Sequence, residues 1–497
     1  MAASNPLALV LIGFMGAGKT TVGALLAGGC ARPFLDADAE LARVAGKSIA
    51  RIFAEDGEQA FRELEERVIC GLLERRDGAV IAAGGGVLTR ARSRAALVAG
   101  ARTVWLDVPF ETAWERVNSD SRDRPLGVER EGFGELFGAR RAGYTAAADA
   151  IIDGSAPAGV AAAAIRLSVW TSAGASARLG SLAADGRAIA VVDAGVASVV
   201  PAALDQIPLP GGEQVKTVAT LEELWRLFAE RELDRASTVV AVGGGATTDV
   251  AGFAAATFRR GIPWIAVPST LVGQVDAAIG GKTAIDVAAK NDVGAFWMPR
   301  EVICDPLLLE TLPAREWAAG FAEVVKTALL AGGPLWELVR AWGAGPGTVA
   351  ARSELVQRCA GFKVTVVAED PTELGRRAIL NLGHTIGHGV ETAAAGRYRH
   401  GEAIAIGLAA ALRLSVEHAG LERDLALEVD ELLVRSGLPL RASGLGTASV
   451  LAAMRHDKKR VGPGHRFVLL AAPGEPHHGI ELGEQVVEQA VAEALAE

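Results

Sequence analysis

The sequence is poor in the residues that mark several large classes of protein. It has 4 cysteines in 497 residues, and they lack the paired spacing of a disulfide framework or a zinc ribbon. Aromatic residues make up 5% of the chain and its net charge is -9, so no broad basic surface for nucleic acid is expected. No apolar run reaches membrane-spanning length, and the first residues do not resemble a secretory signal. These absences predict a cytoplasmic protein that binds neither nucleic acid nor membrane.

Histidine is missing from most of the chain, since none precedes His384. His384 and His388 lie four apart, and on a helix they would share one face. The Gly-rich run that follows could bring His400 back beside them. A catalytic zinc usually takes three protein ligands of the His, Glu or Asp type and leaves one position open. The spacing therefore suits a zinc site, although a hydrogen-bonded structural pair of histidines has the same pattern.

The length and the composition of one internal stretch predict the domain organisation. Half of the residues are apolar, and 497 residues are enough for two or three domains. Between residues 154 and 180 the chain is rich in Gly, Ser, Ala and Pro, which is typical of a linker. We expect a phosphate-loop domain over 1–160, a linker with a first strand over 161–180, an α/β domain over 181–305 and an all-α domain over 306–497.

A phosphate-binding loop is predicted near the start. A short apolar strand over 7–12 runs into Gly13-Phe-Met-Gly-Ala-Gly18-Lys19-Thr20, and an Ala/Leu-rich helix follows. Such a loop turns backbone N–H groups toward phosphates, its lysine reaches the outer phosphates and its threonine can bind Mg²⁺. The next strand ends in Asp36 and Asp38, one of which could serve the metal and the other a substrate hydroxyl. The residues expected to hold the nucleotide and Mg²⁺ are Gly13, Gly16, Ala17, Gly18, Lys19, Thr20, Thr21 and Asp36.

Two later segments fit a kinase. A buried strand over 79–83 ends in a glycine triplet, which would let a ligand approach the backbone. The charged segment over 118–131 contains Arg122, Arg124 and Pro125 and is the natural candidate for a mobile lid.

Residues 1 to about 155 resemble shikimate kinase through the motifs GFMGAGKTTVG, FLDAD, SIARIF, GEQAFRELE, VIAAGGG and DRPL. The resemblance implies a fold like that of the nucleoside monophosphate kinases, with a parallel sheet and a phosphate loop. It places Arg124 on the lid that closes over ATP and Arg116 near the adenine. The arginine before Tyr144 is Arg140 by this resemblance, with Arg141 as the alternative. The residues implied to hold shikimate are Asp38, Arg62, Gly84, Gly85, Gly86 and Arg140.

The second half has its own nucleotide signal. A strand over 238–242 runs into Gly243-Gly-Gly245 and a helix of small residues, an arrangement that can cradle a pyrophosphate in a Rossmann-like domain. Lysine and carboxylate side chains follow in the stretch from Asp276 to Asp286 and again at Lys290-Asn291. From Pro306 the pattern becomes helical, and Glu323 and Lys326 lie three apart on one helix face.

Residues from about 165 to 497 resemble 3-dehydroquinate synthase through GGEQVK, GGGATTDVAGFAAATFRRG, QVDAAIGGKTAID, KNDVGAFW, AEVVKTA, LNLGHTIGH, HGEA and DKK. The resemblance implies that Glu323, His384 and His400 bind zinc, with cobalt as the alternative, and that His388 is not a ligand but either contacts the ligands or faces the substrate. The residues implied to hold NAD are Asp193, Glu213, Lys216, Gly244, Gly245, Asp249, Ser269, Thr270, Lys282 and Asn291. The residues implied to line the substrate site are Arg260, Asp276, Lys282, Asn291, Lys326, Lys363, Arg377, Asn381 and Lys458.

Together the two resemblances imply a bifunctional enzyme of aromatic amino-acid precursor synthesis. The first half would phosphorylate shikimate with ATP and Mg²⁺, with Lys19, Asp38 and Arg124 as its catalytic residues. The second half would convert a heptulosonate 7-phosphate into 3-dehydroquinate with NAD and zinc, and by resemblance it would form a homodimer. Its catalytic residues would be Arg260, Asp276, Lys282, Asn291, Lys326 and His388. Three alternatives remain: a polyol dehydrogenase or an aminocyclitol-forming cyclase in the second half, and a non-catalytic phosphate-loop module in the first.

Overall fold

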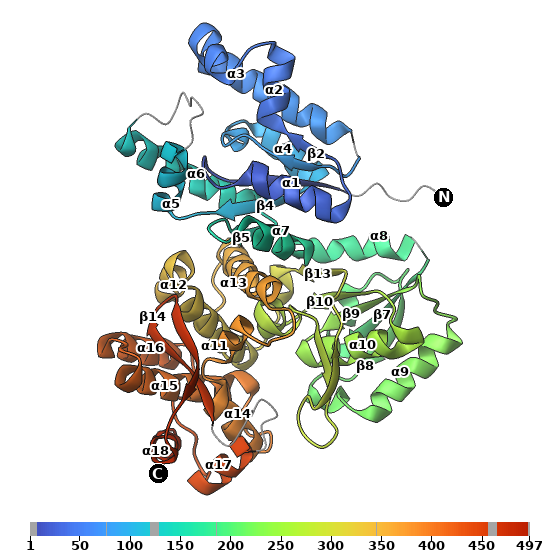
Figure 1. Cartoon of the computed structure of the whole chain (residues 1–497). Coiled ribbons are helices and arrows are strands. Elements are labelled where there is room, and N and C mark those ends of the chain that lie inside the picture. The colour runs from blue at the N-terminus through green and yellow to red at the C-terminus, as the bar shows by residue number, and fades with distance from the viewer. Residues whose placement is uncertain are drawn as a thin grey trace. The chain divides into compact units, whose positions relative to one another are not determined.

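The chain forms two compact units in the computed structural model, which describes residues 7–75, 77–119, 129–184, 186–343, 345–455 and 465–495. The first unit runs from Met1 to Trp170 and the second from Thr171 to Glu497 (Figure 1). Each unit has its own parallel sheet. The chain is therefore an α/β protein with a helical C-terminal region, as the sequence predicts.

The first unit is built on a five-stranded sheet in the order β2-β3-β1-β4-β5, and all of its strand pairs are parallel. Its central strand β1 is buried along its whole length, which explains why it is apolar at every position and not at alternate ones. The strands are β1 (Ala8–Ile12), β2 (Phe34–Asp36), β3 (Val80–Ala82), β4 (Ala101–Asp107) and β5 (Ala150–Asp153).

Seven helices complete the described part of this unit: α1 (Lys19–Cys30), α2 (Ala37–Ala45), α3 (Ile49–Glu74), α4 (Ala91–Gly100), α5 (Phe110–Ser119), α6 (Arg130–Ala147) and α7 (Ala158–Arg166). Helix α7 lies in the stretch whose composition suggested a linker. Ala161, Ala162, Ala164 and Ile165 are buried and α7 packs against α1, so residues 158–166 belong to the first unit. The following strand β6 (Val169–Thr171) joins the second sheet.

The second unit has a six-stranded sheet in the order β6-β13-β10-β9-β7-β8. The pairs from β13 to β8 are parallel. Parallel strands place their C-terminal ends at one edge, where α/β proteins bind nucleotides. The elements of this part are β7 (Ala188–Asp193), β8 (Asp205–Leu209), β9 (Thr238–Gly243), β10 (Trp264–Pro268), β13 (Glu301–Cys304), α8 (Leu179–Ala184), α9 (Val218–Glu230) and α10 (Gly245–Thr257). An antiparallel ribbon of β11 (Lys282–Ile285) and β12 (Val293–Phe296) precedes β13.

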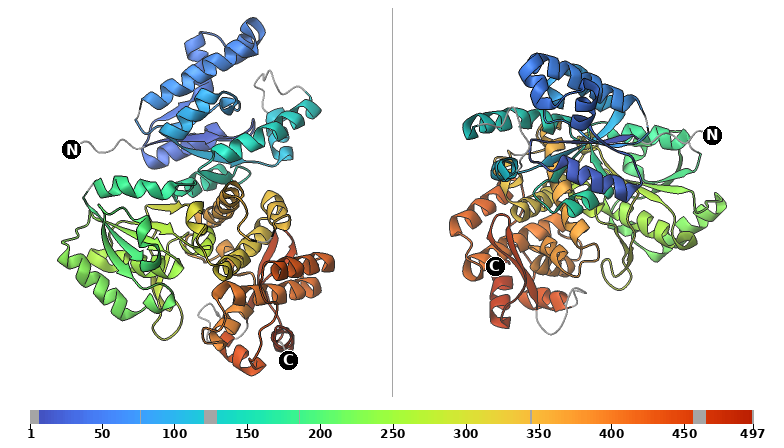
Figure 2. Two further views of the ribbon diagram at one scale, coloured as in Figure 1. Left: turned by 180° about the vertical axis from the view of Figure 1, so that it is seen from behind. Right: turned by 45° about the horizontal axis from the view of Figure 1, so that its top comes forward.

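A helical region follows, and Figure 2 shows its orange and red helices gathered apart from the green strands of the sheet. Its core helix α11 is buried at every residue from 317 to 330. The region was expected to be all-α, but it contains a hairpin of β14 (Arg466–Ala472) and β15 (Glu475–Glu481). Its helices are α11 (Ala314–Ala331), α12 (Gly333–Arg340), α13 (Val349–Glu369), α14 (His384–Ala393), α15 (His400–His418), α16 (Arg423–Arg435), α17 (Thr447–Arg455) and α18 (Glu484–Glu493). Among the described residues, no helix is both long and apolar enough to cross a membrane.

Two glycines of α15 allow its neighbours to approach closely. A Cβ atom at Gly401 would lie 1.8 Å from the carbonyl oxygen of Ala319 on α11. A Cβ atom at Gly407 would lie 2.0 Å from the carbonyl oxygen of Gly383, at the start of α14. Backbone atoms cannot move aside as a side chain can, so only glycine fits at these two positions.

Substitution Gly407→Ala is therefore expected to destabilise the second unit, by about 1–3 kcal/mol for overpacking of a tight contact. The urea midpoint of unfolding, followed by tryptophan fluorescence, would measure the change. Gly180→Ala is the matched control, because no atom lies within 4 Å of the Cβ position at Gly180 on α8. Equal midpoints for the two variants would contradict the close approach of α14 and α15.

Candidate functional site

The phosphate loop lies between β1 and α1 in the predicted context. Gly16 and Gly18 have φ angles of 80° and 87°, values that favour glycine. The Lys19 ammonium group donates to the carbonyl oxygens of Gly13 at 2.9 Å and Phe14 at 3.0 Å, so it is folded over the loop. Helix α1 starts without a side-chain cap, which leaves its first N–H groups available to an anion.

The proposed Mg²⁺ ligands of the first unit are adjacent. The Thr20 hydroxyl donates to Asp36 Oδ2 at 2.8 Å. The other oxygen of Asp36 accepts from the backbone N–H groups of Asp38 at 3.0 Å and Ala39 at 3.2 Å, which caps α2. The cap holds the Asp36 carboxylate toward the phosphate loop. An oxygen pair of this kind suits Mg²⁺.

The glycine triplet after β3 is the meeting point of the predicted shikimate residues. A Cβ atom at Gly84 would lie 3.0 Å from Asp38 Oδ1, and one at Gly85 would lie 3.1 Å from Arg140 Nη1. At Gly86 it would lie 1.9 Å from Arg62 Nη1. Three side chains from three different helices therefore reach one short turn, and larger residues there would push them away.

The two arginines before Tyr144 have different surroundings. Arg141 makes a bidentate ion pair with Asp107, with both N–O distances at 2.9 Å, and lies over the ring of Trp105. Arg140 lies over the ring of Phe14 and faces Gly85. Only Arg140 is therefore placed with Asp38 and Arg62. Arg116 donates to the carbonyl oxygens of Gly16 at 3.2 Å and Gly154 at 2.8 Å, while Arg124 lies outside the described residues.

Glu65 belongs to this group but was not singled out from the sequence. It is buried and accepts from Arg62 Nη1 at 2.8 Å. Burial raises the pKa of its carboxyl group, and the charge of Arg62 opposes that shift. The i, i+3 spacing from Arg62 inside the motif GEQAFRELE is a signal that could have identified it.

The nucleotide residues of the second unit gather at one edge of the sheet. Asp193 ends β7, and a Cβ atom at Gly243 would lie 3.0 Å from Asp193 Cβ. Thr270, just after β10, lies against Gly244, and the Ser269 N–H donates to the Gly243 carbonyl at 2.9 Å. The three strand ends thus form a surface of backbone and small side chains, as a dinucleotide requires.

Hydrogen bonds of the buried Lys216 join three segments at this edge. Lys216 is 2% exposed, donates to Asp249 at 2.7 Å and also donates to Asn291. Burial raises the pKa of Asp249 to about 6, although the charge of Lys216 opposes the shift. This network connects the segment after β8 with α10 and with the loop between β11 and β12.

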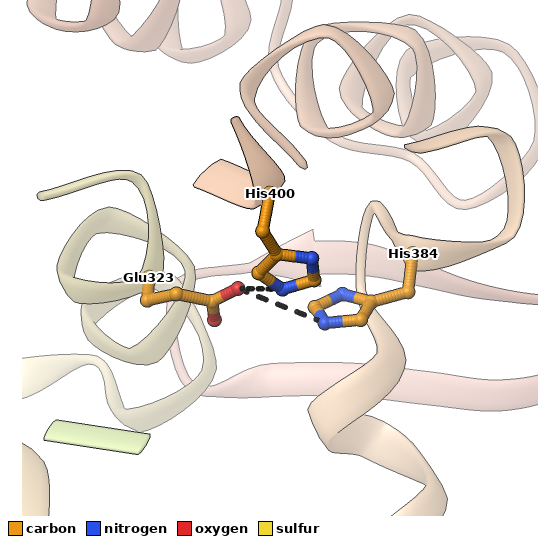
Figure 3. Close-up of side chains that lie close together, drawn as sticks. All are labelled: Glu323, His384 and His400. Carbon is orange, nitrogen blue, oxygen red and sulfur yellow. Dashed lines mark ion pairs between the residues drawn. The ribbon is translucent and has the colours of Figure 1, made fainter. Parts of the chain in front are cut away.

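Glu323, His384 and His400 converge in the second unit (Figure 3). Glu323 Oε1 lies 3.2 Å from His400 Nε2 and 3.7 Å from His384 Nε2. The Nδ1 atom of His384 faces the Leu382 carbonyl at 3.1 Å, and that of His400 faces Glu391 Oε2 at 3.0 Å. Each ring is therefore oriented through Nδ1 and presents Nε2 to the carboxylate, as metal-binding histidines do.

The chemistry of this set fits a divalent cation. Glu323 is fully buried, and neither of its oxygens has a partner at hydrogen-bonding geometry, although Lys326 Nζ lies 2.5 Å from Oε2. Burial opposes ionisation of Glu323, but the charges of Lys326 and His400 lower its pKa below the usual range. Burial lowers the pKa of His400, while Glu323 and Glu391 raise it to a net value of about 9. A bound cation would take the place of that proton.

His388 lies beside the set, with its ring centroid 5.1 Å from that of His384 and 5.9 Å from that of His400. It comes from the same face of α14 as His384. His388 is not one of the three residues of that set, and its role beside the ligands or toward the substrate stays a prediction.

Charged side chains surround Glu323, His384 and His400, which we call the metal set. Lys363 on α13 donates to the Asp276 carbonyl at 2.6 Å and to its carboxylate, and Lys326 Nζ lies 3.9 Å from Asp276 Oδ2. Asp276 lies in a π-helical turn, Gly273–Ala277. Burial opposes ionisation of Asp276, but Lys326 and Lys363 lower its pKa to about 2. Burial lowers the pKa of Lys363.

A second group forms around Glu373, which was not predicted. Lys282 pairs with Glu373, and Asn381 Nδ2 donates to it at 3.0 Å. Arg377 donates to the carbonyl oxygens of Gly280 at 3.0 Å and Pro371 at 2.7 Å. Glu373 lies four residues before Arg377, but the sequence gives no sign that a loop would bring it to Lys282.

Two predicted substrate residues are not brought into these groups. Arg260 is exposed, and among the described residues the ion pairs of Asp276 are with Lys326 and Lys363. Its φ angle is 66°, in the left-handed region. Lys458 lies outside the described residues.

Comparisons with known proteins match different families to the two units of the chain. The family model for shikimate kinase matches residues 15–167. The models for the N-terminal and C-terminal parts of 3-dehydroquinate synthase match residues 206–319 and 320–460. The 3-dehydroquinate synthase of Latilactobacillus sakei is 39% identical over 271 residues, which are 54% of this chain and 75% of that protein. That of Symbiobacterium thermophilum is 39% identical over 332 residues, 62% of this chain and 92% of that protein.

Solved structures resemble the second unit. The 2-epi-5-epi-valiolone synthase of Streptomyces hygroscopicus, with NAD⁺ and Zn²⁺ bound, is 26% identical and covers 65% of this chain and 96% of its own, with a TM-score of 0.60. A 2-deoxy-scyllo-inosose synthase complexed with carbaglucose-6-phosphate, NAD⁺ and Co²⁺ is 26% identical and covers 66% and 96%, with a TM-score of 0.59. Both resemblances found in the sequence are confirmed: the chain belongs to the 3-dehydroquinate synthase family and carries a shikimate kinase domain in front of that part.

Proposed function

We propose that the chain is a bifunctional enzyme. Its first unit transfers a phosphoryl group from ATP to the 3-hydroxyl of shikimate. Its second unit converts 3-deoxy-D-arabino-heptulosonate 7-phosphate into 3-dehydroquinate and phosphate, with NAD and zinc. The observation that carries this proposal is the set of buried Glu323, buried His384 and half-buried His400 with lysines around it, in a chain whose first unit has a complete phosphate loop.

In the first unit, positioning and charge neutralisation are the main requirements of phosphoryl transfer. Lys19 would swing from the loop carbonyls to the outer phosphates, and Thr20 with Asp36 would hold Mg²⁺. Asp38, which lies beside Gly84, would accept the proton of the substrate hydroxyl. Arg62 and Arg140 would bind the substrate carboxylate, since a guanidinium group matches a carboxylate with two donors. Arg124, predicted on the lid, would complete the charge neutralisation.

In the second unit, Glu323, His384 and His400 would hold zinc, and the sheet edge with Asp193, Gly244 and Thr270 would hold NAD. When bound, zinc would polarise a substrate hydroxyl and NAD would accept and return a hydride. Lys326, Lys363 and Arg377 supply the positive charge that a phosphate and a carboxylate need. Asp276 forms ion pairs with both lysines and so holds them in position. His388 would move a proton beside Glu323, His384 and His400. We also propose, from the family alone, that this unit forms a homodimer.

A second candidate function comes from the structural relatives. The valiolone and deoxy-inosose synthases resemble this chain at 26% identity, so a cyclase for another sugar phosphate has support. The curated relatives at 38–40% identity carry the name 3-dehydroquinate synthase, which favours the heptulosonate. Phosphate release from the heptulosonate phosphate, compared with release from glucose 6-phosphate, would decide between them.

The two activities should be separable in one preparation. Lys19→Ala is expected to lower shikimate-dependent ADP formation by about 10²–10³-fold, because it removes a charge that stabilises the transferred group. His384→Ala is expected to lower NAD-dependent phosphate release by at least about 100-fold, through loss of the metal. Each variant should keep the other activity.

The matched controls are Lys47→Ala, at a lysine paired with Glu55 and Asp56, and His418→Ala, at an exposed histidine. Both controls should keep both activities. A wild-type chain without shikimate-dependent ADP formation would show that the first unit is a non-catalytic phosphate-loop module.

The two adjacent arginines should give opposite results. Arg140→Met is expected to raise the KM for shikimate by about 10–100-fold, because a charged hydrogen bond to a carboxylate contributes about 1.5–3 kcal/mol. Arg141→Met removes the ion pair with Asp107 and should lower the thermal midpoint while leaving that KM within about threefold. Steady-state kinetics and thermal unfolding would measure both. A larger KM change for Arg141→Met would reverse the assignment.

A further inference from the structure

A series of ion pairs and hydrogen bonds begins at His400 and continues through Glu391 and Lys290 to Glu213. His400 presents Nδ1 to Glu391 Oε2 at 3.0 Å. The other oxygen of Glu391 accepts from Lys290 Nζ at 2.7 Å, and the same Nζ lies 3.1 Å from Glu213 Oε1. The side chain of Glu391 is 14% exposed, so its charge is largely shielded from water. These contacts connect a proposed zinc ligand with the segment after β8, which is proposed to bind NAD.

The four residues come from separate parts of the chain. Glu391 lies on α14, on the same face as His384 and His388, at positions i, i+4 and i+7. Lys290 lies in the loop between β11 and β12. That loop is held in place by Asp286, which accepts from the Asn291 N–H at 2.7 Å, and by Asp292, which accepts from three backbone N–H groups. The Lys290 ammonium group is therefore carried by an ordered turn.

Glu391 could instead be a ligand of a second metal ion. His388, Glu391 and His400 have ligand atoms within 4.8 Å of one another and could in principle hold a second cation. However, the Glu391 carboxylate already pairs with the Lys290 ammonium group on one oxygen and with His400 on the other. A cation there would have to displace Lys290 and would repel it. The contacts favour a carboxylate that orients a metal ligand over a second metal site.

We propose that Glu391 is a positioning residue that orients His400 toward zinc and, through Lys290, couples zinc binding to NAD binding. The inference rests on the proposed function of the second unit. A carboxylate behind a metal-binding histidine fixes the ring and raises its basicity. Because Lys290 is shared between Glu391 and Glu213, the position of its ammonium group depends on both sites.

Coupling of this kind is reciprocal, so zinc should strengthen NAD binding by the same factor by which NAD strengthens zinc binding. We expect a factor of about five, at the lower end of the usual range, because Lys290 and Glu213 are partly exposed and their pairing is screened by solvent. High salt should reduce the factor further.

Four proteins would test the proposal: the wild-type chain, Glu391→Gln, Lys290→Met and the control Glu428→Gln. Glu428 on α16 is partly exposed and pairs with Arg340, and no hydrogen bond or ion pair among the described residues joins it to Glu323, His384 or His400. Zinc affinity would be measured by chelator competition, and NAD affinity by titration calorimetry with and without zinc. The absorption spectrum of the Co²⁺-loaded protein would report ligand geometry, and metal analysis would give the number of ions per chain.

Glu391→Gln should weaken zinc by about tenfold, change the Co²⁺ spectrum and abolish the coupling. Lys290→Met should keep zinc affinity within about threefold but lose the coupling, and Glu428→Gln should match the wild type. Equal zinc affinity and spectra for Glu391→Gln and Glu428→Gln would overturn the positioning role. Coupling that survives in Lys290→Met would overturn the route through Lys290.

Two results for the wild type separate failure of the inference from failure of the proposed function. A wild-type chain that binds neither zinc nor NAD refutes the proposed function of the second unit, and the inference with it. A wild-type chain that binds both, with two zinc ions, keeps the proposed function but assigns Glu391 to a second metal site. Thermal unfolding of each preparation, compared with the wild type, would show that the second unit of each variant is folded.

Discussion

The second unit depends on the burial of Glu323. Moving a carboxylate from water into the protein interior costs on the order of several kcal/mol, even after the surroundings relax. Nearby charges and hydrogen bonds must offset this cost. Every residue of α11 from 317 to 330 is buried, so the carboxylate is removed from bulk water. The compensation comes from Lys326 on the same helix face and from His400 on α15. A carboxylate held in this way is charged, desolvated and ready for a cation.

The same requirement extends outward. Lys326 is itself buried and carries a positive charge, which Asp276 balances from a π-helical turn. Asp276 then pairs with Lys363 from α13. Negative and positive side chains thus alternate from Glu323 to Lys363, and each one forms an ion pair with the next. The pairs add little net stability, because desolvation offsets most of their attraction, but removing one member would leave another uncompensated. This explains why so many charged residues share one buried region.

Close approach of the backbone makes the arrangement possible. Gly401 and Gly407 let α15 contact α11 and the start of α14, so the first residue of α15, His400, comes within 3.2 Å of Glu323. The first unit uses the same means, since the glycine triplet after β3 admits Asp38, Arg62 and Arg140 to one turn. In both units, glycine provides the space and longer polar side chains provide the chemistry.

The sequence predicted what depends on local pattern. The phosphate loop, the glycine turn after β9 and the helical face shared by His384 and His388 all follow from neighbouring residues, and all are present. The choice of Glu323 over His388 as a ligand came from family resemblance, because the spacing of residues does not show which helix faces which. For the same reason Glu391 and Glu373 were missed, since their partners His400 and Lys282 lie on other elements. The β14–β15 hairpin was missed because a helical pattern dominates around it.

The two units can be understood as chemically independent. The groups proposed for phosphoryl transfer lie between residues 13 and 144, and those proposed for zinc and NAD lie between 193 and 400, each set within one compact unit. The proposed product of the second unit is 3-dehydroquinate, whereas the proposed substrate of the first is shikimate. A dehydration and a carbonyl reduction must lie between them, and no residue set in either unit is proposed to perform these steps. Direct transfer from one site to the other would therefore carry a compound that the receiving site cannot use, so the fusion is better explained by equal production of two enzymes.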